Sequence, residues 1–410
     1  MDLRIVDARI LTDDGASPHS IEIEKNQIVA VSPGYRAGQG EHATIDAGGR
    51  FVLPGMINAH NHLSLQGRLA GQERGRYYDV YREDAAVQAV NCVRSGVQLL
   101  AHGVTTVRDA GSAWFASLAA RDLFRSGSLA GPRVFSCGKV LSVPYEGGDV
   151  KPPGMTIDVA DPEEIVRTIG ELVKDYSVDF VKLKGHRRDF SDEERTAFFT
   201  PEAIAVAGHE AHRLGKGFAV HAWHNDIVDA ALRAGVADSV EHGNCLVERP
   251  DLLRRMKDSG TIFVPNLTSW APSKQANHEA NKRAGIRLEK SWETVECAIA
   301  EGVEIAAGTD LYCSELPVEL AAYLKLGMKR NEVLNTVTTT AARLLGLDES
   351  LGRVSPGYLA DLLLIDRHPF DDLSALSSPD IVIMNGVAYD GHALRDITRR
   401  HGTFTETVLV

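Results

Sequence analysis

Apolar and polar positions alternate at both ends of the chain, as they do in strands that bury one face. The alternating run 3–10 leads to turn-forming residues at 13–15, and further alternation covers 21–31. Near the other end, 360–366 and 381–386 are strand-like. Because chain termini often lie close together in folded proteins, we expect the two ends to complete one small β-sandwich.

A different pattern fills the middle of the chain, where apolar runs of strand length alternate with amphipathic helical stretches. The strand-like runs are Phe51–Ile57, Val104–Val107, Arg133–Cys137, Phe180–Leu183, Gly217–Val220, Ser239–Glu241, Thr261–Val264 and Glu304–Ala307. The predicted helices include Pro162–Lys174, Pro201–Leu214, Ile227–Ala234, Pro250–Asp258 and Leu288–Glu301. Eight successive β–α units predict a (β/α)₈ TIM-like barrel in an α/β protein. A doubly wound open sheet is the alternative that counting strands leaves open.

These patterns divide the chain into three segments. We expect 1–52 and 355–410 to form the β-sandwich and 53–354 to form a metal-binding barrel. A chain of 410 residues is long enough for one large barrel and a smaller module. Its 24% of charged and 44% of hydrophobic residues are typical of a globular enzyme rather than a disordered or membrane-embedded chain.

The charge of the chain bears on its partners, and its cysteine content bears on its cellular compartment. The formal net charge is −12 without a block of Lys or Arg, so we expect neither nucleic acid nor a membrane surface as a partner. The five cysteines form no C-x-x-C pair, which favours a reducing compartment over a disulfide framework. No signal-peptide pattern and no apolar run of about 18 residues occur. A cytoplasmic protein is therefore expected.

Residues of metal-ligand type stand at the ends of the predicted strands, where a barrel of this kind carries its reactive groups. His60 and His62 end the first strand and, being two residues apart, point to the same face. His221, His242 and Asp310 end the fifth, sixth and eighth strands. An H-x-H pair alone is weak evidence. Five such residues on one rim predict a metal site, with nitrogens about 2.0–2.1 Å from the ion.

Two lysines lie on the fourth predicted strand. Alternation places Lys182 and Lys184 on one face, directed to the interior or the mouth of the barrel. A buried ammonium is costly unless it is paired or modified. A neutral lysine that takes up CO₂ becomes a carbamate able to bridge two metal ions. Pairing with Asp179 or extension into solvent are the alternatives.

As a set, six motifs resemble those of the amidohydrolase superfamily over essentially the whole chain. They are Pro54–His62, Gly103–Gly111, Asp179–Lys182, Glu241–Gly243, Gly308–Asp310 and Gly352–Asp361. The set is most similar to the branch of Xaa-Pro dipeptidase-like and imidazolonepropionase-related enzymes. That resemblance implies homo-oligomers and two divalent metal ions.

The resemblance also implies a role for each candidate ligand. His60, His62 and Asp310 would hold one ion, His221 and His242 the second, and carboxylated Lys182 would bridge the two. The family's D-x-(I/V)-K spacing selects Lys182 over Lys184. Zinc suits these nitrogen and oxygen ligands, which also accept iron or manganese.

Such a site would generate a nucleophile from water. Two cations lower the pKa of a bridging water toward neutrality and polarise a carbonyl group. Asp310 is the expected general base, which passes the proton on to the leaving nitrogen. We therefore predict hydrolysis of an amide-like C–N bond in a small molecule: an N-acyl amino acid, a dipeptide, or a xenobiotic amide, carbamate or urea.

Two departures from the family pattern bear on the substrate. The T-G-G-H-x-D stretch of dipeptidase-like relatives is replaced by Val143–Asp149, which lacks the histidine and offers Tyr145. Trp223 stands where those relatives carry a tyrosine that binds the substrate carboxylate. The candidate substrate-binding residues are Tyr145, His186, Arg187, Trp223, His224 and Asn266.

Two other functions stay open at this point. One is a cyclic amidase or deaminase, although His224 occupies the position where deaminase relatives carry glutamate. The other is a non-catalytic barrel scaffold. Scaffolds of that kind typically lose ligands, whereas this chain retains all six ligand-type residues.

Overall fold

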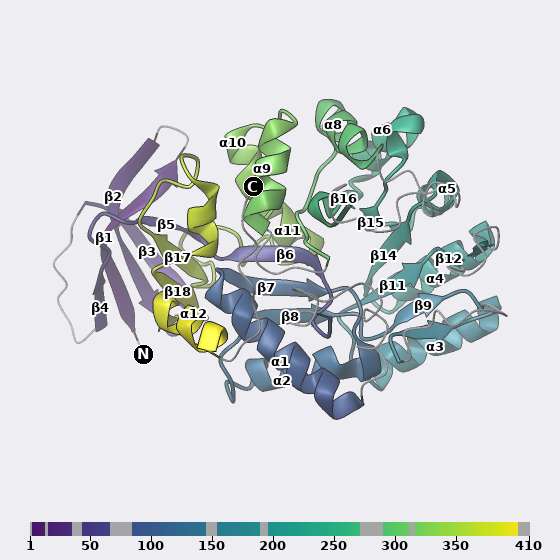
Figure 1. The fold of residues 1–410 in the computed structure, drawn as a ribbon, viewed down its shortest axis with the longest axis horizontal. Helices are drawn as coiled ribbons and strands as arrows, with labels where there is room; N and C mark the ends of the chain where they lie inside the picture. Colours follow the sequence, from purple (N-terminus) through teal and green to yellow (C-terminus); the bar gives the residue numbers. More distant parts are fainter. Residues whose placement is uncertain are drawn as a thin grey trace.

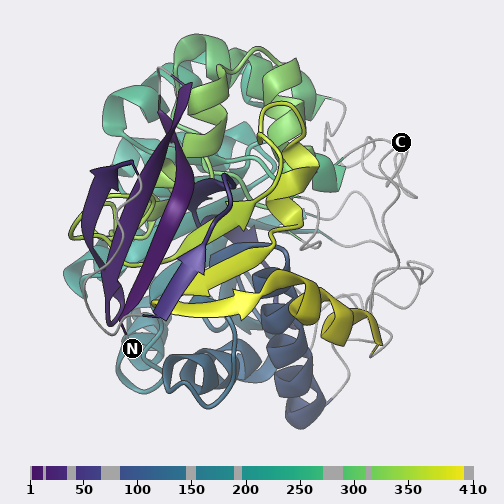
Figure 2. The same ribbon diagram turned by 90° about the vertical axis from the view of Figure 1, so that its left-hand side faces the viewer.

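Both ends of the chain meet in one sheet of eight strands. The computed structural model describes residues 2–12, 15–34, 43–65, 84–144, 154–188, 196–270, 290–310 and 316–400. The strands of this sheet are β1 (Leu3–Thr12), β2 (Gly15–Glu24), β3 (Gln27–Pro33), β4 (Ala43–Asp46), β5 (Phe51–Pro54), β17 (Leu362–Ile365), β18 (Ile381–Met384) and β19 (Val387–Asp390). Their order is β19-β18-β17-β5-β1-β2-β3, with β4 beside β1. Figure 2 shows the purple first strands next to the yellow last strands.

The alternating pattern accounts for the face that this sheet buries. In β2, Ile21 and Ile23 are buried, whereas Glu22 is half-buried and Glu24 is exposed. Successive side chains of a strand point to opposite faces, so the isoleucines form one inner surface. They belong to an apolar cluster that also contains Leu364 from the other end of the chain.

The prediction of a single strand over Phe51–Ile57 is wrong, because the chain changes sheets at Gly55. Before this glycine, β5 pairs antiparallel with β17; after it, β6 (Met56–Asn61) pairs with β7 (Val104–Asp109). A Cβ atom on Gly55 would lie 2.2 Å from Oγ1 of Thr105. Glycine is therefore required where the two strands approach each other most closely.

Parallel strands form the middle of the molecule (Figure 1). One sheet has the order β6-β7-β8 and another the order β10-β9-β11-β14-β15-β16. The further strands are β8 (Arg133–Ser136), β9 (Val140–Ser142), β10 (Thr156–Asp158), β11 (Phe180–Lys184), β14 (Gly217–Ala222), β15 (Ser239–His242) and β16 (Ile262–Val264). A small antiparallel pair, β12 (His186–Arg188) and β13 (Thr196–Phe198), follows β11. The protein is thus α/β with parallel sheets.

The segment Glu304–Asp310 connects the last parallel strand with the first. On one side, the backbone nitrogen of Phe263 in β16 donates to the carbonyl of Glu304 (2.8 Å). On the other side, the backbone nitrogen of Asp310 donates to the carbonyl of His60 in β6 (2.9 Å). The predicted strand Glu304–Ala307 is present as a parallel bridge at Ile305 rather than as a regular strand.

Helices lie outside these strands, and several begin where the sequence predicts. They are α1 (Ala85–Ala101), α2 (Ala116–Arg125), α3 (Pro162–Lys174), α4 (Pro201–Arg213), α5 (Asn225–Ala234), α6 (Pro250–Ser259), α8 (Ser291–Glu301), α9 (Leu316–Lys325), α10 (Arg330–Asn335), α11 (Thr339–Leu344) and α12 (Gly391–Arg400). Asp161 and Thr200 cap α3 and α4 by accepting hydrogen bonds from backbone nitrogens, just before a proline that suits the first turn. None of the helices in the described part of the chain combines the length and apolar character needed to cross a bilayer.

An ion pair joins the terminal sheet to the parallel strands. Arg133, the first residue of β8, donates to the carboxylate of Asp361 (2.6 Å) and to the side chain of Asn385 (2.7 Å). Asp361 also accepts a hydrogen bond from the backbone nitrogen of Asn385 (2.9 Å). The terminal sheet therefore contacts the amino ends of the parallel strands, which leaves their carboxyl ends for a site.

Candidate metal centre

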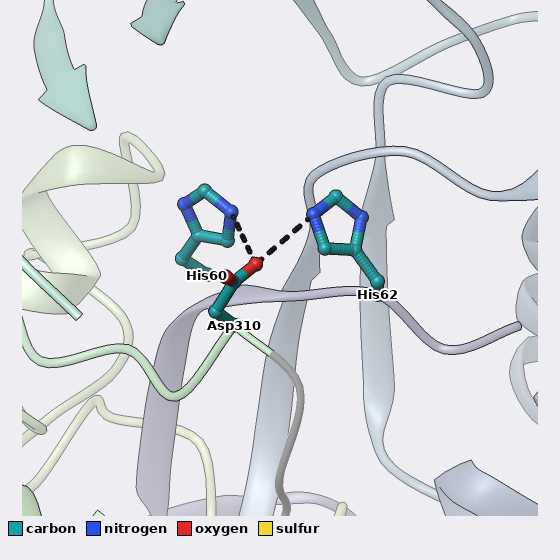
Figure 3. A group of neighbouring side chains, drawn as sticks. All are labelled: His60, His62 and Asp310. Carbon is teal, nitrogen blue, oxygen red and sulfur yellow. Dashed lines mark ion pairs between the residues drawn. The ribbon is translucent and has the colours of Figure 1, made fainter. Parts of the chain in front are cut away.

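Three buried side chains meet at the carboxyl end of β6. His60 lies within this strand, His62 directly follows it, and Asp310 lies at the end of the segment that pairs with it. Oδ1 of Asp310 is 3.5 Å from Nε2 of His60 and 3.2 Å from Nε2 of His62 (Figure 3). The structure therefore brings these three candidate ligands together.

The distances between these atoms suit the ligands of a single metal ion. Two atoms that each lie about 2.0–2.1 Å from a tetrahedral ion are roughly 3.3 Å apart. One ligand atom from each of the three residues lies within 4.8 Å of the others. Burial alone would raise the pKa of Asp310, but the neighbouring His60 and His62 hold this pKa well below its usual range. An ionised carboxylate beside two imidazoles fits a divalent metal such as zinc.

Three residues at neighbouring strand ends have a left-handed backbone conformation, which is rare for residues with side chains. The angle φ is 71° at His242, 52° at Asn266 and 57° at Asp310. Each such conformation costs of order 1–3 kcal/mol and persists only where the surrounding structure enforces it. These three residues make this rim a strained end of the parallel strands and a candidate for a functional site.

Glu241 is a buried residue of the site for which the sequence analysis assigned no role. Its Oε2 lies 2.6 Å from Nδ1 of His60, and its Oε1 accepts hydrogen bonds from Arg108 (2.8 Å) and Ser239 (2.6 Å). Burial would raise the pKa of Glu241, but Arg108 and His60 hold this pKa well below the usual range. The signal in the sequence was a carboxylate directly before His242, at the end of the strand-like run Ser239–Glu241.

The ring of His62 is held by the backbone instead. Its Nδ1 lies 2.6 Å from the carbonyl oxygen of Gly111, just after β7. Gly111 has a φ of 130°, and a Cβ atom there would lie 2.6 Å from the side chain of Val140. Glycine at this position therefore allows the carbonyl to reach the histidine.

Lys182 is the lysine that the structure brings to the site. Its Nζ lies 3.2 Å from Nε2 of His60, and the side chain is buried. Burial lowers the pKa of Lys182, although Glu241 and other anionic groups raise it. Lys184 is only half-buried. Of the two lysines, Lys182 is therefore the one that lies beside His60.

His221 and His242 lie next to these ligands. The ring centroid of His242 is 5.1 Å from that of His60 and 4.6 Å from that of His221. Burial holds the pKa values of both histidines well below their usual range, so that the rings are neutral and able to ligate. Among the described residues, Nε2 of His221 is buried without a hydrogen-bond partner. A bound metal ion would satisfy that nitrogen.

The substrate-binding candidates are only partly brought together. His186 lies within ring-contact distance of Trp223 (4.9 Å between centroids), His224 (5.0 Å) and His221 (5.2 Å). Phe198 of β13, which the sequence analysis did not name, is 5.0 Å from His224. These rings form an aromatic wall beside His221.

The remaining candidates differ in their placement. The amide nitrogen of Asn266 lies 3.3 Å from Nδ1 of His242, so Asn266 contacts a ligand-type residue. Tyr145 and the side chain of Arg187 are outside the described residues.

The strained rim, the buried imidazoles and the ionised aspartate define an α/β protein with a metal-type site at the ends of parallel strands. The chain belongs to the amidohydrolase family, whose model matches residues 51–389. This finding confirms the resemblance seen in the sequence motifs, and the chain's homologues in this family are hydrolases.

Individual relatives span most of the chain. Ochratoxinase from Aspergillus niger is 25% identical over 376 residues, covering 81% of this chain and 73% of that protein. Imidazolonepropionase from Rubrobacter xylanophilus is 25% identical over 387 residues, covering 85% of each. A crystal structure of a Xaa-Pro dipeptidase with bound methionine is similar with a TM-score of 0.81 and 25% identity, covering 95% of this chain and all of that one.

Proposed function

We propose that this protein is a binuclear metal-dependent amidohydrolase that cleaves an amide-like C–N bond of a small molecule. The observation that carries the proposal is the convergence of His60, His62 and Asp310 at distances suited to one metal ion. The proximity of Lys182 to His60, and of His242 to both His60 and His221, supports a second ion. Membership of the amidohydrolase family supports hydrolysis as the reaction.

We infer that the parallel strands close into the predicted (β/α)₈ barrel over 53–354. The hydrogen bonds of Glu304–Asp310 to both β16 and β6 support this closure. The segments 1–52 and 355–410 would form the smaller β-sandwich module. The site then lies on the carboxyl-terminal rim, where barrels of this type carry their active sites.

The proposed ligands divide between two ions. His60, His62 and Asp310 would hold the first, His221 and His242 the second, and a carbamate on Lys182 would join them. When bound, the ions would lower the pKa of a water molecule toward neutrality and polarise the substrate carbonyl. The carbamate forms when the neutral amine adds to CO₂ and releases a proton. Burial of Lys182 favours that neutral amine.

The chain's own chemical contribution is proton transfer at Asp310. The two histidines keep its carboxylate ionised, so that Asp310 can accept a proton from the attacking water. As the C–N bond breaks, the same residue delivers that proton to the leaving nitrogen. The buried surroundings strengthen the electrostatic interactions that accompany these steps.

A linear amide with a flat apolar group fits the surroundings of the site. The related Xaa-Pro dipeptidase is by its name an enzyme that acts on dipeptides, which supports a linear substrate. The aromatic wall of His186, Trp223 and Phe198 beside His221 supports a planar group next to the scissile bond.

A hydrolysis screen tests the proposal. Zinc-supplemented protein is incubated with N-acyl amino acids, dipeptides, aryl amides, carbamates and ureas, and released amines are measured. We expect activity on at least one class, about two zinc ions per chain, and a loss of at least about 100-fold in kcat in Asp310→Asn.

Two outcomes would contradict the proposal. Ring opening or ammonia release would indicate a cyclic amidase or deaminase instead. Protein that retains no metal and hydrolyses no class would remove the enzymatic assignment.

A further inference from the structure

We propose that Glu241 is a positioning residue of the metal centre, which with Arg108 and Ser239 fixes the ring of His60 so that Nε2 faces Asp310. The inference rests on the proposed function, because it concerns a residue that would bind metal. The ligand set proposed above includes none of these three residues. Their hydrogen bonds connect β7 and β15 to His60.

The carboxylate of Glu241 is fully enclosed and surrounded by polar partners. The side chains of Glu241 and His60 are 0% exposed, and that of Arg108 is 3% exposed. The second guanidinium nitrogen of Arg108 also donates to the hydroxyl of Ser239 (3.0 Å), which in turn donates to Glu241. A carboxylate removed from water is stabilised only by such charged and hydrogen-bonding neighbours, so its position is closely determined.

These partners decide which nitrogen of His60 carries the proton. Arg108 and Ser239 both donate to Oε1 of Glu241, and Oε2 remains as an acceptor for Nδ1 of His60 (2.6 Å). An ionised carboxylate can only accept, so Nδ1 must donate. Nε2 of His60 then presents its lone pair toward Asp310 and Lys182, as a metal ligand requires.

Arg108 is itself packed against an aromatic ring. Its guanidinium lies over the ring of Phe180, 4.2 Å from the centroid. Arg108 comes from β7 and Glu241 from β15, which belong to different sheets, and Glu241 holds His60 of β6. The three side chains therefore fix the position of β6 relative to β15 below the ligands.

The two histidines of the H-x-H pair consequently differ in strength as ligands. Nδ1 of His60 faces an anionic carboxylate, whereas Nδ1 of His62 faces the neutral carbonyl of Gly111. A carboxylate acceptor raises the basicity of a metal-binding imidazole. Loss of the charge on Glu241 is therefore expected to weaken metal binding through His60.

The test compares Glu241→Gln with the wild type by titrating zinc against a chromogenic chelator and by recording the absorption spectrum of the cobalt-substituted protein. We expect zinc affinity to fall by about 10- to 100-fold and the cobalt bands to shift. Asp361→Asn is the matched control, because it also removes a buried carboxylate paired with an arginine (Asp361–Arg133, 2.6 Å), where the terminal sheet contacts the amino ends of the parallel strands. It should lower thermal stability and leave zinc affinity unchanged.

The inference would be overturned if folded Glu241→Gln kept the zinc affinity and the cobalt spectrum of the wild type while Asp310→Asn lost zinc. The proposed function would then still stand. Wild-type protein that binds no zinc would overturn both. If Glu241→Gln does not fold, the zinc affinity of Ser239→Ala tests the inference instead, because this substitution removes a single hydrogen-bond donor to Glu241. A several-fold loss of zinc affinity in Ser239→Ala would support the inference, and an unchanged affinity would overturn it.

Discussion

The two histidines of the H-x-H pair each have Nδ1 engaged by a different kind of acceptor. Nδ1 of His60 faces the carboxylate of Glu241, and Nδ1 of His62 faces the carbonyl of Gly111. Nε2 of each of these two rings is thereby left for a ligand. Hydrogen bonds to the non-ligating ring nitrogen orient a metal-binding histidine and increase metal affinity.

Substitution of the two lysines of β11 separates their roles. Lys182→Ala should reduce kcat/KM by about 100-fold or more, because a metal supplies several kcal/mol of transition-state stabilisation. Lys184→Ala should be much milder, since Lys184 is half-buried and Lys182 contacts His60. Hydrolysis rates, zinc content and circular dichroism of both variants check this. Full activity in Lys182→Ala would refute the proposed bridging role of Lys182. A larger loss of activity in Lys184→Ala than in Lys182→Ala would assign that role to Lys184.

At the scale of elements, the site depends on how closely the last parallel segment approaches β6. The backbone of Asp310 and Thr309 donates to the carbonyl of His60, and Gly308 lies against the same residue. Two strands can come this close only where one of them carries no side chain. The H-x-H pair and Asp310 meet because of this approach.

Gly308→Ala tests this close packing. A Cβ atom at this position would lie 2.7 Å from Cβ of His60 and 2.9 Å from its backbone nitrogen. We expect a loss of about 1–3 kcal/mol in unfolding free energy, as in other overpacked cores, together with weaker zinc binding. Denaturant unfolding and zinc titration measure both effects.

Gly170→Ala in α3 is the control for this substitution, because its added Cβ meets nothing within 4 Å. It should be neutral or stabilising, since alanine favours a helix over glycine. Unchanged zinc affinity and stability in Gly308→Ala would show that the approach of the two strands is not needed.

At the scale of the whole molecule, the two ends of the parallel strands have separate tasks. The amino ends contact the terminal sheet through Arg133 and Asp361, and the carboxyl ends hold the buried histidines. Keeping three histidines neutral in the interior imposes a dependence of stability on pH. Burial is the largest cause that lowers the pKa values of His62, His221 and His242.

The metal-free protein should therefore lose stability in mild acid. Below about pH 6.5, the unfolded chain protonates these histidines while the folded chain does not, so protons favour unfolding. After the metal is removed by chelation, the unfolding free energy should fall as the pH is lowered from about 7.5 to 5.5. The loss should be up to about 1.4 kcal/mol per pH unit for each histidine. Urea unfolding at several pH values measures this slope.

Two variants show whether the buried histidines cause that dependence. His221→Gln should reduce the slope, whereas His392→Gln, at a side chain that is 74% exposed, should leave it unchanged. If the unfolding free energy of the wild type and of His221→Gln changed equally with pH, the buried histidines would not be the cause of the dependence. Zinc added at about pH 7.5 should raise the stability of the wild type, because ligands that bind only the folded state stabilise it.

Local patterns in the sequence predicted several helices and most strand positions, and they singled out the residues of ligand type. Pro162 and Pro201 begin helices behind their caps, and His60, His62 and Asp310 stand at strand ends, because short-range periodicity and turn chemistry are written in neighbouring residues. Motif spacing was also sufficient to identify the family.

Only the tertiary structure decided the features that depend on contacts between distant segments. The chain changes sheets at Gly55 because β6 must approach Thr105, which local alternation does not record. Glu241 supports His60 because residues 108, 239 and 241 meet beneath it, although 133 positions separate Arg108 from Glu241. Such contacts arise from packing, whereas a sequence pattern reflects only the residues adjacent along the chain.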